Sequence, residues 1–351
     1  MAKGKEAIAL LLSIGITGGV LYFGAQYAQD YFSGESGNGN GSPTVNAPNS
    51  PLSSGGRSPE TFVDVEGVPQ GLFSYGGSTT WAPIRGEIDQ ALPIVKPGFE
   101  LRYTDPVAEP PGSGAGIKML LNNQLAFSQS SRPLKPEEYE AAEQKGFTLT
   151  EIPVAIDGLA IAVHPDLNIP GLTVAQLRDI YLGNITNWQQ VGGPNLEIIP
   201  YTRDEEAGGT VDFFVDSILS GEALGSNTQE VFSTTEALRL VSENLGGIYY
   251  ASAPEVVPQC TVKTIAVGRS PDQLITPYLE PFKPLSNCPA ERNSLNNDAF
   301  RTGEYPLTRS LFVIVKQNNA VEQQAGEAYA NLLLSQQGQD LIEQTGFVRI
   351  R

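Results

Sequence analysis

Basic residues are few in this sequence, and histidine and cysteine are nearly absent. Lys and Arg together number 22 against 39 Asp and Glu, which gives a formal net charge of -17, and there are one His and two Cys. Because nucleic acids are bound through a basic surface, this balance argues against a nucleic-acid partner. So few His and Cys side chains also leave no cluster for a metal ion or an activated nucleophile. We therefore expect no metal and no cofactor, and we expect that the protein is not an enzyme.

The two cysteines are Cys260 and Cys288, and the single histidine is His164. Two thiols and one distant imidazole do not make a metal site. Outside the cytoplasm, an even number of cysteines indicates disulfide bonding. We expect one disulfide between these two cysteines if the chain is exported.

Long hydrophobic runs are also rare, and the one that stands out is at the N-terminus. No charged residue occurs from Ala7 to Gln29, and Lys3 and Lys5 precede this run. A helix crosses a bilayer with about 20 apolar residues, and lysines mark its cytoplasmic end. We interpret residues 1–32 as an anchor in the lipid bilayer; the alternatives are a cleaved signal peptide and a buried helix of a soluble protein. Either membrane interpretation places the rest of the chain in the periplasm or at the cell exterior.

Residues 33–67 are dominated by Gly, Asn, Ser and Pro. Such a segment buries too little apolar surface to offset its chain entropy. We expect a disordered linker here, followed by a folded region over residues 68–351.

The folded region alternates strand-like and helix-like patterns. LTEIPVAIDGLAIAV (149–163) is rich in β-branched residues, whereas KPEEYEAAEQKG (135–146) has early acids and a late lysine before glycine, as helices do. This alternation predicts an α/β fold with a largely parallel sheet. In such folds, ligands bind outside the carboxyl ends of the strands.

Three segments share one design, in which a strand leads through a Gly/Ser/Thr turn into a helix. They are SYGGSTTWAPI (74–84), PPGSGAGIKML (110–120) and TRDEEAGGTVDFF (202–214). The first N–H groups of a helix are unpaired and carry partial positive charge, so such turns are suited to hold an anion. The alternative is three ordinary capped helices, because Ser, Thr and Gly are also common N-caps.

Several of these motifs together carry a family resemblance. GGSTTWAPI, GSGAGIKML, FSQSSRPL, LRDIYLGNITNW and TRDEEAGGTVDFF, in this order, are similar to the phosphate-binding proteins of phosphate-specific (Pst) ABC transporters, in the type II periplasmic-binding-protein superfamily. The resemblance covers roughly residues 70–350. It implies two α/β lobes with mixed sheets and flanking helices. The first lobe would take about 68–157 plus 251–351, and the second about 158–250.

The resemblance also implies a function. The protein would capture inorganic phosphate between its lobes outside the cytoplasm and deliver it to a membrane permease of an ABC transporter. The alternative is a membrane-tethered sensor or scavenger of phosphate or another oxyanion that is not coupled to transport. The ligand-binding residues that the resemblance implies are Thr79, Thr80, Ser113, Gly114, Ala115, Ser131, Arg203, Gly208, Gly209 and Thr210.

Arg203 suits this role, because its planar guanidinium can donate two parallel hydrogen bonds to a phosphate and stays charged. The sequence departs from the family at two places. Ser131 stands where the family commonly has an aspartate that accepts the proton of hydrogen phosphate, and Ala207-Gly208 replace the usual serine in a third turn that is one residue longer.

We expect that an acid beside Arg203 replaces the lost proton acceptor. The candidates are Asp204, Glu205 and Glu206. The alternative is that one of these acids pairs with Arg203 and the others face solvent. Asp157 lies where the family's strands cross between the lobes, and we expect it to act as a hinge or as a partner for backbone groups rather than as a ligand. The preference between phosphate and an unprotonated oxyanion such as sulfate stays open.

Overall fold

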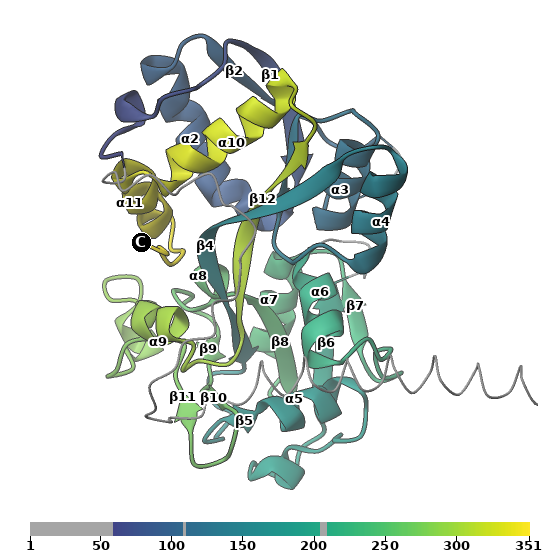
Figure 1. Cartoon of the computed structure of the whole chain (residues 1–351). Helices are drawn as coiled ribbons and strands as arrows, with labels where there is room; N and C mark the ends of the chain where they lie inside the picture. The colour runs from purple at the N-terminus through teal and green to yellow at the C-terminus, as the bar shows by residue number, and fades with distance from the viewer. Residues whose placement is uncertain (1–58, 108–109, 204–208) are drawn as a thin grey trace, which may run out of the picture. The chain divides into compact units, whose positions relative to one another are not determined.

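The computed structural model describes residues 59–107, 110–203 and 209–351 (Figure 1). The predicted membrane segment (1–32) and most of the predicted linker (33–67) lie outside the described residues. Among the helices that are described, none combines the length and the apolar character needed to cross a bilayer.

The folded region begins before residue 68, where the sequence suggested its start. A short turn, η1 (Phe62–Asp64), places Phe62 fully buried and Val65 3% exposed in the apolar core. The Phe62 amide donates to Oε1 of Gln337 at 2.9 Å, which joins the start of the fold to its C-terminal helices. Buried apolar side chains and this hydrogen bond together extend the fold upstream of residue 68.

The strands are listed in chain order: β1 (Gly71–Gly77), β2 (Phe99–Tyr103), β3 (Phe127–Ser130), β4 (Thr148–Val163), β5 (Leu172–Thr173), β6 (Ile199–Arg203), β7 (Gln229–Val231), β8 (Gly247–Ser252), β9 (Lys263–Thr264), β10 (Val267–Gly268), β11 (Leu274–Ile275) and β12 (Thr308–Gln317). The α-helices are α2 (Ala82–Val95), α3 (Ser113–Leu121), α4 (Pro136–Gln144), α5 (Val174–Tyr181), α6 (Gly209–Phe213), α7 (Thr234–Glu243), α8 (Ala253–Val256), α9 (Asn297–Thr302), α10 (Val321–Leu334) and α11 (Gln336–Gln344). Shorter helical turns are η2 (Thr79–Trp81), η3 (Trp188–Val191), η6 (Leu285–Asn287) and the π-helical turn η5 (Phe214–Ile218).

Local signals explain several helix boundaries. Thr173 caps α5, and its hydroxyl accepts from the amide of Gln176 at 3.1 Å. Such caps satisfy amides that have no partner inside the helix. After α4, Gly146 takes a φ of +84°, a left-handed conformation that favours glycine and ends the helix.

One large mixed sheet runs through the described region in the order β2-β1-β3-β12-β4-β8-β6-β7, with β9 paired to β4. β1, β2 and β3 are parallel, and so are β6, β7 and β8, while β12 and β4 run antiparallel to their neighbours. The long strand β4 pairs with β12 along its first part and with β8 from Leu159 onward. Figure 1 shows β4 and β12 running side by side between the two lobes.

Each lobe has its own apolar core. The core of the first lobe contains Trp81, Phe127 and Tyr329, from elements near both ends of the described chain. The core of the second lobe contains Trp188 and Phe214. The protein is therefore a two-lobed α/β fold with mixed sheets and flanking helices.

The two cores divide the chain differently from the expectation drawn from the sequence. That expectation put 251–351 with the first lobe. In the structure, Val256, Phe300 and Tyr305 pack in the second lobe's core. The chain returns to the first lobe only with β12, because the segment between β8 and β12 buries its apolar side chains against the second lobe.

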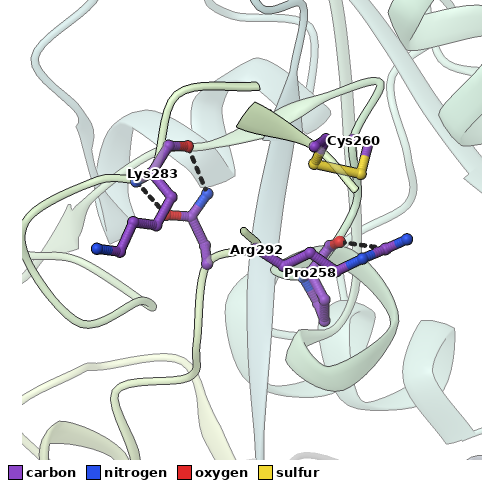
Figure 2. The surroundings of a disulfide bond; sticks show 6 residues. Pro258, Cys260, Lys283 and Arg292 are labelled. Atoms are coloured by element: carbon purple, nitrogen blue, oxygen red, sulfur yellow. Dashed lines mark hydrogen bonds between the residues drawn. A yellow bond between two sulfur atoms is a disulfide. The ribbon is translucent and has the colours of Figure 1, made fainter. Parts of the chain in front are cut away.

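The predicted disulfide between Cys260 and Cys288 is present in this intervening segment (Figure 2). Hydrogen bonds hold the surrounding loop as well. Arg292 donates to the carbonyl of Pro258 at 2.8 Å, and the Lys283 amide donates to Oδ1 of Asn293 at 2.7 Å. The covalent link and these contacts hold the loop together, and Val257 and Val262 at its start pack in the core of the second lobe.

Candidate functional site

The three turns predicted to hold an anion meet at the junction of the lobes. The first lies between β1 and α2, the second begins α3, and the third begins α6. The Thr80 and Thr210 hydroxyl oxygens, from the first and third turns, are 3.4 Å apart. A Cβ placed on Gly209 in the third turn would lie 2.5 Å from Oγ of Ser113 in the second. Segments far apart in the sequence are thus brought into direct contact.

Glycines allow the first two turns to approach each other. Gly77 has a φ of +122°, and a Cβ there would lie 2.2 Å from the carbonyl oxygen of Gln129. A Cβ on Gly116 would lie 2.4 Å from the Cα of Gly77. Only glycine combines this backbone conformation with such close packing, so α3 can lie directly against the end of β1.

Serine hydroxyls form a buried cluster at the same place. Ser78 donates to Oγ of Ser131 at 2.9 Å, and the Ser131 amide donates to Oγ of Ser113 at 3.1 Å. The Ser113 and Ser131 hydroxyls are 3.3 Å apart, and all three side chains are fully buried. Each hydroxyl can both donate and accept, so the cluster offers polar groups on the side of the site that the first lobe supplies.

A buried ion pair lies beside this cluster, on the two strands that join the lobes. Arg309 of β12 donates to Oδ2 of Asp157 of β4 from Nε at 3.0 Å and from Nη2 at 2.8 Å. Ser252 donates to the other carboxylate oxygen at 2.5 Å. Burial raises the pKa of Asp157, while the charge of Arg309 and the hydrogen bond from Ser252 oppose that rise. The pair satisfies both charges within the core.

Arg309 also reaches residues of both lobes. Its Nη2 lies 3.1 Å from Oγ1 of Thr80 and 2.9 Å from Oγ1 of Thr210, and its Nη1 donates to the carbonyl of Gly209 at 2.8 Å. The guanidinium therefore connects the first and third turns.

A small cavity opens at this point. Its lining residues are Thr79, Thr80, Arg203, Thr210, Val211, Thr234, Tyr249, Tyr250, Ala251 and Glu255. Arg203 ends β6, as expected of a residue at the carboxyl end of a strand. Burial raises the pKa of Tyr249 to about 12, so this phenol keeps its proton, and stays a neutral hydrogen-bonding group, well into the alkaline range.

Charged side chains line the rim of the junction. Arg132, which follows β3, pairs with Glu138 at 2.7 Å and with Asp212 of α6 at 3.7 Å. Lys135 pairs with Asp216 of η5 at 3.1 Å. Burial raises the pKa of Asp212, and the charge of Arg132 opposes the rise. The Arg132–Asp212 and Lys135–Asp216 pairs add electrostatic contacts between the lobes outside the buried cluster, whereas Glu138 holds Arg132 within the first lobe.

The structure brings most of the predicted site residues together. Ser113, Ser131 and Gly209 lie in mutual contact, and Arg203 lines the cavity with the three threonines, Thr79, Thr80 and Thr210. Gly114 lies near Arg132, with 3.5 Å between a Cβ placed there and Nη2. Ala115 is half-buried in the first turn of α3. The predicted ligand Gly208 and the predicted acceptors Asp204, Glu205 and Glu206 lie outside the described residues.

Several residues of the site were not predicted, among them the cavity-lining Thr234, Tyr249, Tyr250 and Glu255. Asp157 was expected to act as a hinge, and Arg309 was not singled out at all, although the two form the buried pair. A charged residue in each of two strongly apolar strand segments, AIDGLAI and TRSLFVIV, is the signal that could have found them. Among the residues that the structure describes, no group of three or more His, Cys, Asp or Glu side chains could hold a metal ion.

Comparison with known proteins places this chain among binding proteins. A family model described as "PBP superfamily domain" matches residues 64–337. Protein SphX of Synechococcus elongatus is 28% identical over 285 residues, which is 79% of this chain and 77% of that protein. Phosphate-binding protein PstS of Borreliella burgdorferi is 26% identical over 280 residues, which is 80% of this chain and 90% of that protein.

A solved structure is similar as well. It is a crystal structure from Clostridium perfringens of a phosphate ABC transporter substrate-binding protein with bound phosphate. It matches with a TM-score of 0.61 and 25% identity, over 80% of this chain and 100% of that one.

Proposed function

Because this chain belongs to the PBP superfamily, we propose that it captures inorganic phosphate between its two lobes outside the cytoplasm and delivers it to an ABC permease. The observation that carries the proposal is that the starts of η2 and α6 line one small cavity together with Arg203, while Ser113 at the start of α3 packs against Gly209 of α6. Relatives and a solved structure with similar sequences are named as phosphate-binding proteins. These are binding proteins by name, and we propose that this chain likewise has no catalytic activity of its own.

The proposed phosphate site combines charge with directional donors. Arg203 supplies a fixed positive charge and a guanidinium fork that matches two phosphate oxygens. Thr79, Thr80 and Thr210 supply hydroxyls, and the start of α3 adds amides and the hydroxyl of Ser113. Local donors of this kind can hold an anion although the formal net charge of the chain is -17. We keep Ser131, Gly114, Ala115, Gly208 and Gly209 as proposed members of the site, and Asp204, Glu205 and Glu206 as proposed acceptors.

The lobes must move for phosphate to enter. The cavity has a volume of about 20 Å³, close to the space that one water molecule needs. Phosphate is larger, so we infer that the lobes separate to admit it and close again around it. β4 and β12 are the connections about which this motion would occur.

We propose the following organisation of the chain. The first lobe takes about 62–157 plus 308–351, and the second about 158–307, in line with the two apolar cores. Residues 1–32 anchor the chain in the plasma membrane or are removed as a signal, and the segment after them is a linker to the folded region. This arrangement keeps the lobes outside the cytoplasm, near a permease.

Titration calorimetry of the full chain with phosphate and with sulfate, across pH, tests the proposal. We expect phosphate binding, and we expect Arg203→Ala to weaken it by about 100-fold, the value of a lost charge-assisted pair. The matched control is Arg239→Ala, because Arg239 lies on α7 and pairs with the exposed Glu243, in hydrogen bonds of 3.0 and 2.8 Å. Absence of binding to any oxyanion would refute the proposal. Binding of sulfate as tight as that of phosphate would change the ligand to an unprotonated oxyanion.

Delivery to a permease needs its own test. Deletion of the gene should impair growth of the source organism on limiting phosphate, and normal growth together with normal phosphate binding would favour the sensor or scavenger role.

A further inference from the structure

The guanidinium of Arg309 contacts two hydroxyls that belong to opposite lobes. Thr80 comes from the turn before α2 in the first lobe, and Thr210 from the first turn of α6 in the second. We propose that Arg309 is a positioning residue that makes both threonine oxygens accept, so that at least one of the two hydroxyls is oriented as a hydrogen donor toward a bound oxyanion. The inference rests on the proposed function, because it concerns the same site.

The argument begins with the hydrogens of Arg309. Its Nη2 carries two hydrogens and lies within hydrogen-bonding distance of Asp157, Thr80 and Thr210. The shortest contact, at 2.8 Å, is to the Asp157 carboxylate and uses one hydrogen. The second hydrogen is then shared between the two threonine oxygens, a three-centre arrangement that proteins commonly use. A single N–H group therefore contacts both lobes.

The consequence for the threonines follows from the chemistry of the groups. A guanidinium has donors and no acceptor, so each threonine oxygen must accept from Arg309. The hydroxyl proton of each threonine is then left to donate elsewhere. The contact between the two threonine oxygens, 3.4 Å, can use at most one of these protons. At least one proton is thus available to the cavity, which both threonines line together with Arg203.

Arg309 is held firmly enough to impose this orientation. It is 4% exposed, it donates to Asp157 from two nitrogens, and its Nη1 donates to the carbonyl of Gly209. Asp157 is fixed in turn by Ser252. Because the charge of Arg309 is largely balanced by Asp157, its contribution to the site is direction more than attraction. Arg203 lines the cavity itself.

A double-mutant cycle on the full chain, with inorganic phosphate as the probe, tests the inference. Arg309→Lys keeps the charge opposite Asp157 but replaces the planar fork by a single ammonium. We expect it to weaken phosphate binding by about tenfold or more, as expected for a lost hydrogen bond to a charged group. In a Thr210→Val background, which lacks the hydroxyl, we expect Arg309→Lys to add less than about threefold, because the two changes remove the same interaction.

Thr210→Ser is the matched control, since it retains the hydroxyl and should retain the full effect of Arg309→Lys. An equal effect of Arg309→Lys in the Thr210→Val and Thr210→Ser backgrounds would overturn the inference and indicate a purely structural role. If Arg309→Lys does not fold, Arg309→Gln combined with Asp157→Asn removes both charges, and the same cycle is read with that pair. Phosphate binding that none of these Arg309 variants weakens overturns the role of Arg309 alone. Failure of the unaltered chain to bind phosphate overturns the proposed function and this inference with it.

Discussion

Two groups of charged residues lie between the lobes, and they differ in burial. At the buried junction, the side chains of Arg309 and Asp157 are 1% and 0% exposed and lie 2.8 Å apart. At the rim, Lys135 and Asp216 lie 3.1 Å apart, but their side chains are 36% and 43% exposed. The two pairs therefore have similar distances but differ in how strongly solvent screens their charges. A buried pair strongly resists the loss of one partner, whereas an exposed pair is weakened by water and salt.

The two groups also differ in what they connect. The buried pair joins β12 to β4, and its additional hydrogen bonds to Thr80 and Thr210 reach both lobes. The rim pair links a single residue of each lobe directly. The comparison indicates that the junction sets the geometry of the site, while the exposed Lys135–Asp216 pair contributes a weak and salt-dependent attraction between the lobes.

The largest expected effect comes from breaking the buried pair. Arg309→Met leaves the carboxylate of Asp157 buried without its partner, and we expect the free energy of unfolding to fall by about 3–5 kcal/mol. Urea denaturation followed by circular dichroism measures this change. Asp157→Asn in the same chain should recover much of the loss, because it removes the uncompensated charge. A loss below about 1 kcal/mol would mean that the junction is no stronger than the rim.

Alkaline pH offers a second way to test burial at the junction. Burial raises the pKa of Tyr249 to about 12, compared with about 10 for tyrosine in an unfolded chain. Between these values the folded state keeps a proton that the unfolded chain loses. The contribution of Tyr249 to stability is thus full below about pH 10 and is lost as pH rises through about 12. Tyr249→Phe should reduce the slope of stability against pH in this window by up to about 1.4 kcal/mol per pH unit.

Urea denaturation at several pH values between about 9 and 12 measures these slopes. Other buried tyrosines, among them Tyr305 and Tyr329, also have a raised pKa and will add to the alkaline loss in both proteins. The difference between the unaltered chain and Tyr249→Phe isolates the one residue at the cavity. If stability falls with pH equally steeply in the unaltered chain and in Tyr249→Phe, the pKa of Tyr249 is not raised by burial, and Tyr249 is as accessible to solvent as the residues of the rim.

A third test inserts a methyl group between the lobes. In Gly209→Ala, the new Cβ would lie 2.1 Å from Oγ of Ser131 and 2.5 Å from Oγ of Ser113. Either the serine hydroxyls leave their hydrogen bonds or the lobes move apart, at a cost of about 1–3 kcal/mol. We expect phosphate binding, measured by calorimetry, to weaken by about tenfold or more. Gly86→Ala is the matched control, because a Cβ on this helical glycine meets nothing within 4 Å, and it should leave binding unchanged.

How much of this site is predictable from sequence depends on the range of the interactions. The Gly/Ser/Thr turns before α2, α3 and α6 are local patterns, and the structure places Thr80, Ser113 and the start of α6 at one junction. Strand and helix alternation likewise predicted the α/β class. The mixed directions of the sheet were not visible in single segments, because they follow from how β4 and β12 pair with distant strands.

The residues that sequence analysis missed depend on contacts between distant segments. Arg309 is 229 positions from Thr80 and 99 positions from Thr210 along the chain. A charge in its apolar strand marks it as unusual, but the strand alone does not show which distant residues the arginine contacts. The boundary of the second lobe was misplaced for a similar reason. The sequence does not show that Phe300 and Tyr305 pack in the core of the second lobe, because their neighbours there are distant along the chain. Contacts between distant segments thus determine both the role of Arg309 and the boundary of the second lobe.

The smallest effects are expected at the rim. Lys135→Ala and Asp216→Ala should each change phosphate affinity by less than about threefold, because exposed ion pairs contribute about 0–1 kcal/mol. The Debye length falls from about 10 Å at 0.1 M salt to about 3 Å at 1 M, so this small contribution should vanish at high salt. Calorimetry measures the phosphate affinity of the unaltered chain and of Lys135→Ala at both salt concentrations. The effect of salt on phosphate itself is the same for both proteins, so it cancels in their difference. A roughly tenfold loss in Lys135→Ala that persists at about 1 M salt would reverse the comparison, because it would place the decisive contact between the lobes at the rim rather than at Arg309.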